Sequence, residues 1–261
     1  NEFILLNGNE TGIIIANYML AKLKEQNKLV ENSYIVKTIV TTDTIHSIAD
    51  DYKIEVMDTL TGFKYIGEVI EKNPNRNFIM GFEESYGYLT GDFIRDKCGV
   101  SAAAMISEIA LDCKINKITL VDYLNEIYSK YGFRKESLKS YTLKGAEGNE
   151  KIKSIMLKLR NNPPKEIANI KVSKVRDCQT CEIKQDDKVI KKIELPKSNV
   201  LTFFLEDDST VTVRPSGTEP KIKFYFSVKG NISDDTSLDN AKKEVLEKTS
   251  LLINNVEEWI K

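Results

Sequence analysis

The most specific chemistry in the sequence lies in a short turn between two β-like runs, residues 214–221. Gly217 permits a positive φ, so that successive backbone N–H groups can point toward one anion. Ser216 and Thr218 add hydroxyl donors. Arg214 can bind a phosphate through two parallel hydrogen bonds, and Lys221 adds a second positive charge. A plain hairpin turn needs none of these donors, so the turn predicts phosphate binding.

A second candidate is the loop at residues 81–88, with the sequence G-F-E-E-S-Y-G-Y, which follows an apolar run typical of a buried strand. Open α/β sheets place ligand loops at such strand ends. Its carboxylates can accept charge-assisted hydrogen bonds from the hydroxyls of a sugar. The residues alone leave open a solvated acidic loop with one tyrosine packed on the core. A glycosidase pair is disfavoured, because its carboxylates must flank one bond from opposite faces.

The third candidate, residues 95–100, carries two cations ahead of a long apolar helix, whose N-terminus favours anions. Taken alone, this segment is better explained as a charged helix entry capped by Asp96 or Ser101. His46, the only histidine, is expected to be packed or exposed rather than catalytic. Cys178 and Cys181 form a lone CxxC, which is too few ligands for structural zinc.

Composition excludes several classes of protein. The 261 residues carry 38 Lys and Arg against 39 Asp and Glu, so no global charge attracts nucleic acid or anionic lipid. No apolar run approaches the roughly 18 residues of a membrane span, and no signal peptide is visible. Four cysteines are too few for a disulfide scaffold, so reduced thiols in a cytoplasm are expected. A hydrophobic share of 41% is enough for a buried core.

The elements that must position these loops fall into two groups. The first half alternates helical and strand periodicity, which predicts a layered α/β domain. Helices are expected over 10–28, 43–50, 61–72, 100–114 and 120–131, with Asp43 as a helix cap, and strands over 34–40, 54–57 and 77–82.

The second half predicts an antiparallel α+β domain, because consecutive strands are followed by a helix. A turn is expected at 145–148, helices over 149–161 and from Ser237, and strands over 170–175, 189–195, 200–205, 210–214 and 221–228. The division expected from these patterns is 1–135 and 136–261.

Together these segments resemble the α-D-phosphohexomutase family, the phosphoglucomutase/phosphomannomutase enzymes. Residues 7–12 and 61–64 resemble loops of its third domain, 81–88 its sugar-recognition loop, and 214–220 the phosphate loop of its fourth domain. The segments follow the family's order and span essentially the whole chain, and the loop at 81–88 is most similar to the bacterial phosphoglucomutase branch.

The resemblance implies a three-layer α/β domain followed by a small α+β domain similar to the TATA-binding-protein fold. The family's first domain carries a serine that cycles through phosphoserine, and its second carries an Asp-rich loop that holds Mg²⁺. Neither motif is present here, and the sequence begins at Asn1 rather than Met. The chain is therefore expected to be a C-terminal fragment that is inactive alone. Its parent would interconvert hexose 1-phosphate and hexose 6-phosphate through a hexose 1,6-bisphosphate.

The resemblance also implies roles for individual residues. Glu83 and Ser85 would hold sugar hydroxyls, and Lys97 would lie near the reacting group, where it polarises an oxygen or moves a proton. Lys64 would be a further substrate contact. The distal phosphate would be held by Arg214, Ser216, Gly217, Thr218 and Lys221. Cys98 departs from the family, which often has aspartate there.

Two alternatives remain open. The chain could be a stand-alone phosphosugar-binding module, or its parent could be a phosphopentomutase or a phosphoglucosamine mutase. The expected partners are a phosphosugar and the missing N-terminal domains, with no nucleic acid and no membrane.

Overall fold

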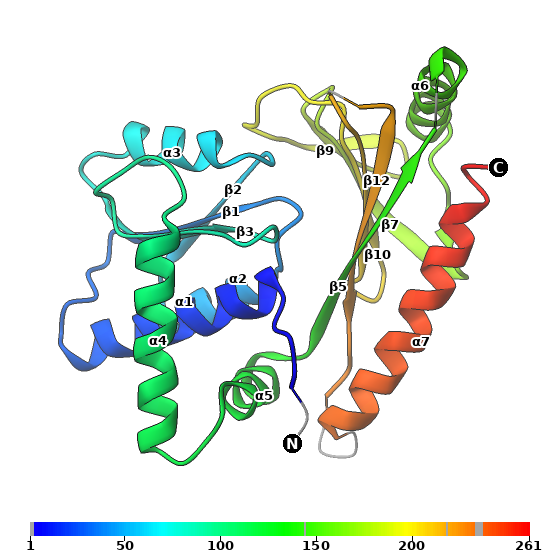
Figure 1. The fold of residues 1–261 in the computed structure, drawn as a ribbon. Helices are drawn as coiled ribbons and strands as arrows, with labels where there is room; N and C mark the ends of the chain where they lie inside the picture. Colours follow the sequence, from blue (N-terminus) through cyan, green and yellow to red (C-terminus); the bar gives the residue numbers. More distant parts are fainter. Residues whose placement is uncertain (1–2, 144, 218, 233–236) are drawn as a thin grey trace. The chain divides into compact units, whose positions relative to one another are not determined.

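The structure is a computed structural model that describes residues 3–143, 145–217, 219–232 and 237–261. The chain divides into two compact units, Asn1–Gly132 and Phe133–Lys261 (Figure 1). The boundary expected after residue 135 falls inside the first strand of the second unit, β5 (Arg134–Thr142).

A four-stranded sheet forms the centre of the first unit, in the order β2 (Glu55–Thr59), β1 (Ser33–Thr38), β3 (Asn77–Glu83), β4 (Gly87–Thr90). β1 runs parallel to β2 and β3, whereas β4 pairs antiparallel with β3. All six residues of β1 are buried, as expected for a parallel strand covered on both faces.

Helices cover both faces of this sheet. In Figure 1, α3 (Phe63–Lys72) lies above it, and α1 (Gly8–Glu25), α2 (Thr44–Tyr52) and α5 (Leu120–Tyr131) lie below. α4 (Gly99–Ile115) contacts β4 at the edge of the sheet. This arrangement confirms the expected three-layer α/β domain.

The start of α1 is set by a capping box. The Asn7 side chain accepts a hydrogen bond from the Glu10 backbone N–H, and the Glu10 carboxylate accepts one from the Asn7 N–H, both at 2.9 Å. These bonds satisfy N–H groups that the first helical turn leaves unpaired. The helix therefore begins at Gly8, ahead of the residue expected from apolar periodicity.

An antiparallel sheet forms the centre of the second unit, in the order β5-β12-β11-β10-β7-β8-β9, with β6 paired to β7. The strands after β5 are β6 (Glu166–Ile167), β7 (Ile170–Asp177), β8 (Glu182–Gln185), β9 (Lys188–Lys192), β10 (Leu201–Leu205), β11 (Thr210–Pro215) and β12 (Lys221–Lys229). This sheet confirms the α+β class expected for the second half.

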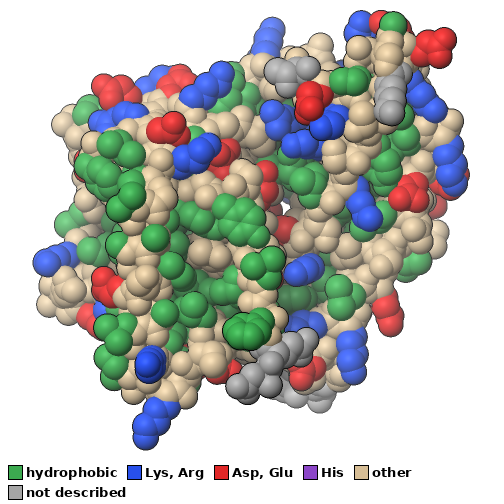
Figure 2. All heavy atoms as spheres, in the orientation of Figure 1, with side chains coloured by type: hydrophobic (Ala, Val, Ile, Leu, Met, Phe, Trp, Pro, Cys, Tyr) green, Lys and Arg blue, Asp and Glu red, His purple; other side chains and the backbone are tan. Residues whose placement is uncertain are grey.

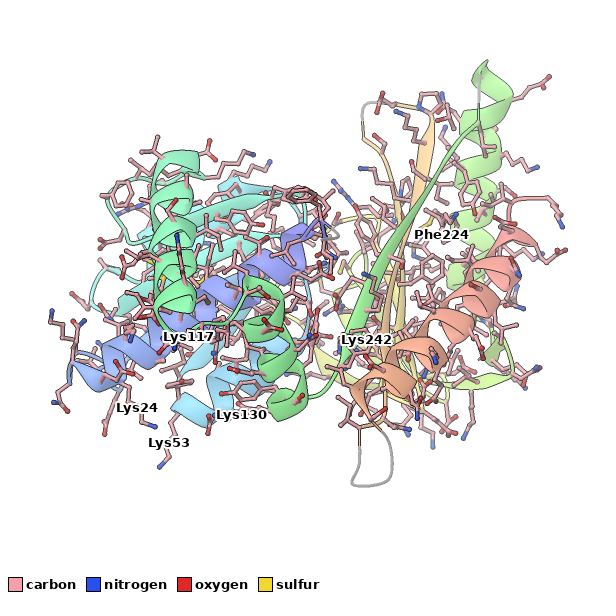
Figure 3. All side chains as sticks on the ribbon, turned by 60° about the horizontal axis from the view of Figure 1, so that its bottom comes forward. Lys24, Lys53, Lys117, Lys130, Phe224 and Lys242 are labelled. Atoms are coloured by element: carbon pink, nitrogen blue, oxygen red, sulfur yellow. The ribbon has the colours of Figure 1, made fainter. Side chains whose placement is uncertain are left out.

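Two helices, α6 (Gly145–Asn161) and α7 (Leu238–Glu257), lie on one face of this sheet (Figure 1). Phe224 of β12, labelled in Figure 3, is fully buried beneath them. Its ring centroid lies 5.9 Å from that of Tyr141 and 6.1 Å from that of Trp259. The opposite face of the sheet carries most of the polar strand residues.

The turn expected at 145–148 is wrong, because these residues form the first turn of α6. A Cβ built on Gly148 would lie only 1.9 Å from the carbonyl oxygen of Leu143. Glycine is needed here for the close approach of two backbone segments, not for a turn.

Within the described residues, no helix is long and apolar enough to cross a membrane. The helix α4 exposes three large hydrophobic side chains, Val100, Leu111 and Ile115. Figure 2 shows hydrophobic side chains on this side of the first unit interspersed with charged ones.

Candidate functional site

The candidate sugar site lies at one edge of the first sheet, where β1, β2 and β3 end. Because these strands are parallel, the loops that follow them meet at the same edge. The sugar-recognition loop predicted from the sequence is the hairpin between β3 and β4, whose terminal residues Glu83 and Gly87 are paired.

Glu83 is buried, with 6% of its surface exposed. Its Oε1 accepts a hydrogen bond of 2.7 Å from the backbone N–H of Gly62, just before α3. A helix N-terminus stabilises a carboxylate, so this contact fixes the side chain in one orientation. A Cβ built on Gly87 would lie 3.3 Å from Glu83 Oε2 and 3.4 Å from Cδ of Lys97. The structure therefore brings Glu83 and Lys97 to the same small space around Gly87.

The tip of the hairpin carries the other predicted sugar contact. Ser85 is exposed there, beside Tyr86, which has a positive φ of 63° and is 57% exposed. Lys64 lies in the first turn of α3, two residues after Gly62, and its Nζ is 4.9 Å from the ring centroid of Tyr65. These side chains are accessible to a ligand, whereas Glu83 is held beneath them.

The N-terminus of α1 packs closely against the hairpin between β3 and β4. A Cβ built on Gly8 would lie 2.1 Å from the carbonyl oxygen of Glu84 and 2.9 Å from the backbone nitrogen of Tyr86. The Tyr88 hydroxyl donates a hydrogen bond of 3.0 Å to the Gly8 carbonyl. Burial raises the pKa of Tyr88 to about 12, so it remains a neutral donor at physiological pH.

Gly8→Ala is therefore expected to destabilise the first unit by about 1–3 kcal/mol, because the added methyl group must displace backbone atoms. Gly99→Ala is the matched control, since Gly99 is likewise the first residue of a helix and its Cβ would meet no atom within 4 Å. We expect its effect to stay within about 0.5 kcal/mol. Urea unfolding of both variants measures the difference, and equal stabilities would contradict the close packing.

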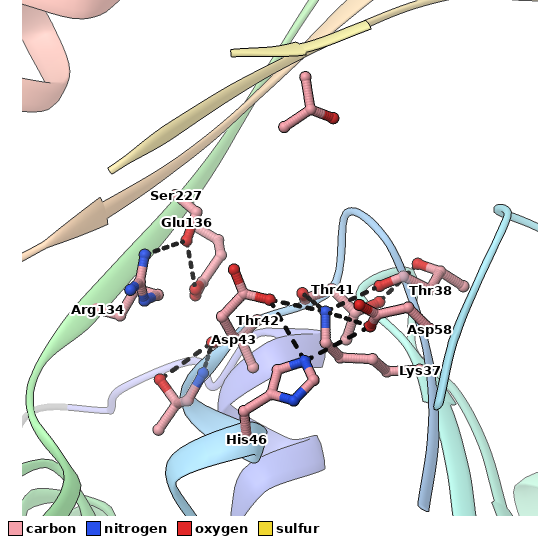
Figure 4. Close-up of polar contacts among 12 residues, drawn as sticks. Lys37, Thr38, Thr41, Thr42, Asp43, His46, Asp58, Arg134, Glu136 and Ser227 are labelled. Atoms are coloured by element: carbon pink, nitrogen blue, oxygen red, sulfur yellow. Dashed lines mark hydrogen bonds and ion pairs between the residues drawn. The ribbon is translucent and has the colours of Figure 1, made fainter. Parts of the chain in front are cut away.

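A buried ionic cluster lies beside this site, and sequence reasoning missed it (Figure 4). The Lys37 side chain is 1% exposed, and its Nζ lies 2.8 Å from Asp43 Oδ1 and 3.0 Å from Asp58 Oδ1. His46 Nε2 lies 3.6 Å from Asp58 Oδ1. Burial works against the charged form of Lys37, yet the two carboxylates hold its pKa above the usual value. The pKa of Asp58 lies well below its usual range, because the effect of Lys37 and His46 outweighs that of burial.

This cluster explains why Asp43, which is the N-cap residue of α2 as predicted, does not cap the helix with its side chain. Asp43 precedes α2, but its side chain makes no capping hydrogen bond and binds Lys37 instead. A signal was present in the sequence: Lys37 interrupts an otherwise β-branched, buried strand, and a buried ammonium group requires partners.

The candidate phosphate site is the turn between β11 and β12. The Ser216 N–H donates to the Lys221 carbonyl at 2.8 Å, and the Glu219 N–H donates to the Ser216 hydroxyl at 3.3 Å. Gly217, where the sequence permits a positive φ, is not among the described glycines that adopt one. The bonds made by Ser216 help to close the turn. Thr218 lies outside the described residues.

Charges around this turn differ from the sequence-based expectation. Lys221 Nζ lies 3.0 and 3.1 Å from the two carboxylate oxygens of Glu219, so its charge is already paired. Arg214 pairs in register with Lys223 on the neighbouring strand, which places both side chains on the same face of the sheet. Neither forms an ion pair within the described part of the chain. Lys223 was not named from the sequence, although strand alternation alone places it on the same face as Arg214.

Comparison with known proteins assigns both units. The family profile described as "Phosphoglucomutase/phosphomannomutase, alpha/beta/alpha domain III" matches residues 7–131, and the profile for the C-terminal domain of the same family matches residues 167–232. The chain belongs to the phosphoglucomutase/phosphomannomutase family. This confirms the resemblance inferred from the loops.

Phosphoglucomutases of Staphylococcus aureus are similar to this family member along most of its length. The protein of strain bovine RF122 / ET3-1 is 40% identical over 233 residues, which cover 88% of this chain and 41% of that protein. The protein of strain USA300 is 39% identical over the same length. The chain thus spans about two fifths of the length of these relatives.

Solved structures agree on the fold. Parafusin, a phosphoglucomutase from Paramecium, aligns with a TM-score of 0.59 at 19% identity, over 95% of this chain and 42% of its own. A phosphoglucomutase/phosphomannomutase family protein from Burkholderia thailandensis aligns with a TM-score of 0.56 at 12% identity, over 98% of this chain and 42% of its own.

Cys98, which the sequence analysis marked as a departure from the family resemblance, takes a structural role. It is the N-cap of α4, in place of Asp96 or Ser101, and its Sγ accepts a hydrogen bond of 3.4 Å from the Ser101 N–H. That bond lowers the pKa of the Cys98 thiol. Asp96 instead accepts a hydrogen bond of 2.7 Å from the N–H of Lys97, which fixes the backbone that carries Lys97.

Proposed function

We propose that this chain supplies the sugar- and phosphate-binding half of a phosphoglucomutase/phosphomannomutase. The complete enzyme would interconvert hexose 1-phosphate and hexose 6-phosphate through a phosphoserine and a hexose 1,6-bisphosphate. The observation that carries the proposal is the buried carboxylate of Glu83, held by Gly62 at the end of a parallel strand in a domain of this family.

In this proposal the carboxylate of Glu83 accepts hydrogen bonds from ring hydroxyls of the sugar, and the hydroxyl of Ser85 donates to them or accepts from them. Lys64 is a further contact. Lys97, next to Glu83, polarises an oxygen or moves a proton at the reacting end. Hydroxyls that are present in both orientations of the substrate can be bound by the same residues, so one site serves both ends of the sugar.

The second unit would bind the phosphate that does not react. Arg214 provides two parallel hydrogen bonds, and Ser216, Gly217 and Thr218 provide hydroxyl and backbone donors. Lys221 contributes less than the sequence suggests, because Glu219 already neutralises it. Fixing the distal phosphate converts binding energy into positioning of the transferred group.

The phosphoryl carrier and the metal would come from segments outside these 261 residues. The family's phosphoserine and Asp-rich loop motifs are absent from this sequence. Among the described residues, no three His, Cys, Asp or Glu side chains are grouped so as to hold a metal ion. The residues present therefore do not fit a Mg²⁺ site, and we derive no step through the metal. We place the complete enzyme in the cytoplasm.

A coupled assay for conversion of glucose 1-phosphate to glucose 6-phosphate tests this proposal. The purified 261-residue chain should show no turnover. The product of the longer reading frame should be active if that frame encodes the serine and Asp-rich loops. Turnover by the chain alone would contradict the proposal. A start codon close to Asn1 would contradict it too and would favour a stand-alone phosphosugar-binding module. Ribose 1-phosphate and glucosamine 1-phosphate in the same assay distinguish the related mutases.

A further inference from the structure

The second carboxylate of the sugar-recognition loop, Glu84, is bound on the side away from Glu83. Its Oε2 lies 3.3 Å from the hydroxyl of Thr41 and 3.4 Å from that of Thr38, both of which can donate to it. Its backbone N–H donates a hydrogen bond of 3.2 Å to the Thr41 hydroxyl. Both the side chain and the backbone N–H of Glu84 are thus hydrogen-bonded to the end of β1 and the turn after it.

The turn after β1 is itself held by Lys37 and Asn9. The buried ammonium of Lys37 donates to the carbonyl oxygens of Thr41 at 3.1 Å and Thr38 at 3.4 Å. The N–H of Thr42 donates to Asn9 Oδ1 at 2.9 Å, which joins the turn to the start of α1. The turn is therefore a rigid support, held by the buried cluster in Figure 4 and by a helix terminus.

Two neighbouring carboxylates thus have separate surroundings. Glu83 is bound by Gly62, on the side of α3, and Glu84 by Thr38 at the end of β1 and Thr41 just after it. Burial, together with the nearby charge of Glu83, raises the pKa of Glu84, which indicates that its position is not a solvated one. Glu84 is half-buried, and a carboxylate withdrawn from water costs free energy unless it keeps hydrogen-bond partners such as these threonines.

We propose that Glu84 is a positioning residue, which acts through Thr38 and Thr41 to hold the loop at residues 83–87 where Glu83 and Ser85 can meet the sugar. The inference rests on the proposed function for the identity of the ligand. A loop that is fixed before binding loses less conformational freedom when the ligand arrives, and small displacements of contact residues reduce binding strongly.

Thr41→Val tests this role, because valine keeps the shape of threonine but removes the hydroxyl that contacts both the side chain and the N–H of Glu84. Two quantities are measured in the 261-residue chain. The first is hydrogen exchange of the Glu84 amide without ligand. The second is the Kd for glucose 1-phosphate compared with the Kd for inorganic phosphate.

We expect exchange of the Glu84 amide to accelerate roughly tenfold, as for loss of one hydrogen bond to a partly buried group. Affinity for glucose 1-phosphate should fall about five- to tenfold, while affinity for inorganic phosphate should not change. Thr41→Ser, which keeps the hydroxyl, should restore both quantities. Thr38→Val removes only one donor and should cause a smaller change of the same kind, which remains informative if Thr41→Val unfolds.

Thr249→Val is the matched control for loss of a buried hydroxyl. Thr249 lies in α7, and its hydroxyl donates to the Val245 carbonyl at 2.7 Å. This variant should leave exchange of the Glu84 amide unchanged.

Unchanged exchange in Thr41→Val would overturn the proposal, as would equal losses for glucose 1-phosphate and inorganic phosphate. Failure of Thr41→Ser to restore the loop would also overturn it. If the wild-type chain binds neither ligand, the proposed function fails, and the exchange measurement alone decides whether Glu84 is held by Thr41.

Discussion

Replacing Lys37 by methionine should destabilise the first unit by about 3 kcal/mol, the low end for breaking a buried ion pair. The loss arises because Asp58 Oδ1, which is shielded from solvent, loses the ammonium of Lys37 and keeps only the half-exposed imidazole of His46, at 3.6 Å. The low end applies because Asp43 and Asp58 keep 40% and 32% of their side-chain surface exposed and can be partly solvated. Urea unfolding, followed through amide signals of the first unit, measures the change.

The effect of this substitution should depend on pH. In the wild type the pKa of Asp58 is lower in the folded than in the unfolded state. Its stabilising contribution is therefore complete above the unfolded value of about 3.9 and is lost as the pH falls through the folded value. In Lys37→Met the Asp58 carboxylate loses its nearest cation and keeps only His46, so burial raises the pKa of Asp58 relative to the wild type. Protonation of Asp58 at acidic pH then reduces the loss of stability in the variant. The stability difference should be largest near pH 7 and smaller near pH 4.

Lys130→Met is the control for loss of an exposed ion pair. Lys130 lies at the surface in Figure 3 and its Nζ is 2.7 Å from Asp51 Oδ2, with 59% and 43% of the two side chains exposed. Its removal should cost less than about 1 kcal/mol. If Lys37→Met cost no more than Lys130→Met, the cluster would not be the support that we describe.

Arg214→Ala should reduce the affinity for inorganic phosphate by roughly 10- to 100-fold, the range for loss of hydrogen bonds between charged groups. Calorimetric titration of the purified chain measures it. Lys229→Ala is the control, because Lys229 lies at the far end of the paired strand β12 and is bound to Asp208 at 2.7 Å. We expect a several-fold loss in Lys223→Gln and a smaller one in Lys221→Gln. If Arg214→Ala bound inorganic phosphate with wild-type affinity, the turn between β11 and β12 would not be the phosphate site.

The fold class could be predicted because apolar periodicity is a local signal. Each helix of the first unit was found within a few residues, and the α/β and α+β patterns of the two halves are confirmed. The strands β4, β5, β6 and β8 were missed. β5, with the sequence R-K-E-S-L-K-S-Y-T, has no buried residue, so it lacks the alternation that marks a half-buried strand. Its existence depends on pairing with β12, which is distant in sequence.

The candidate loops could be found from residue types, but their supports could not. Lys37, Asp58 and His46 come from three different elements, and only the packed sheet brings them together. Asp43 fits two roles equally well in the sequence, cap and ion-pair partner, and the buried ammonium decides between them. Gly148 is a similar case, since a close backbone approach and a turn both require glycine.

Titration of glucose 1-phosphate into the 261-residue chain, followed by amide chemical shifts, tests the central claim most directly. The account predicts shifts in both units, at Glu83 and Ser85 in the hairpin and at Ser216 and Gly217 in the turn. In Arg214→Ala the shifts in the turn should disappear. Shifts confined to other surfaces, or none at millimolar glucose 1-phosphate and inorganic phosphate, would contradict the assignment of both loops as ligand sites.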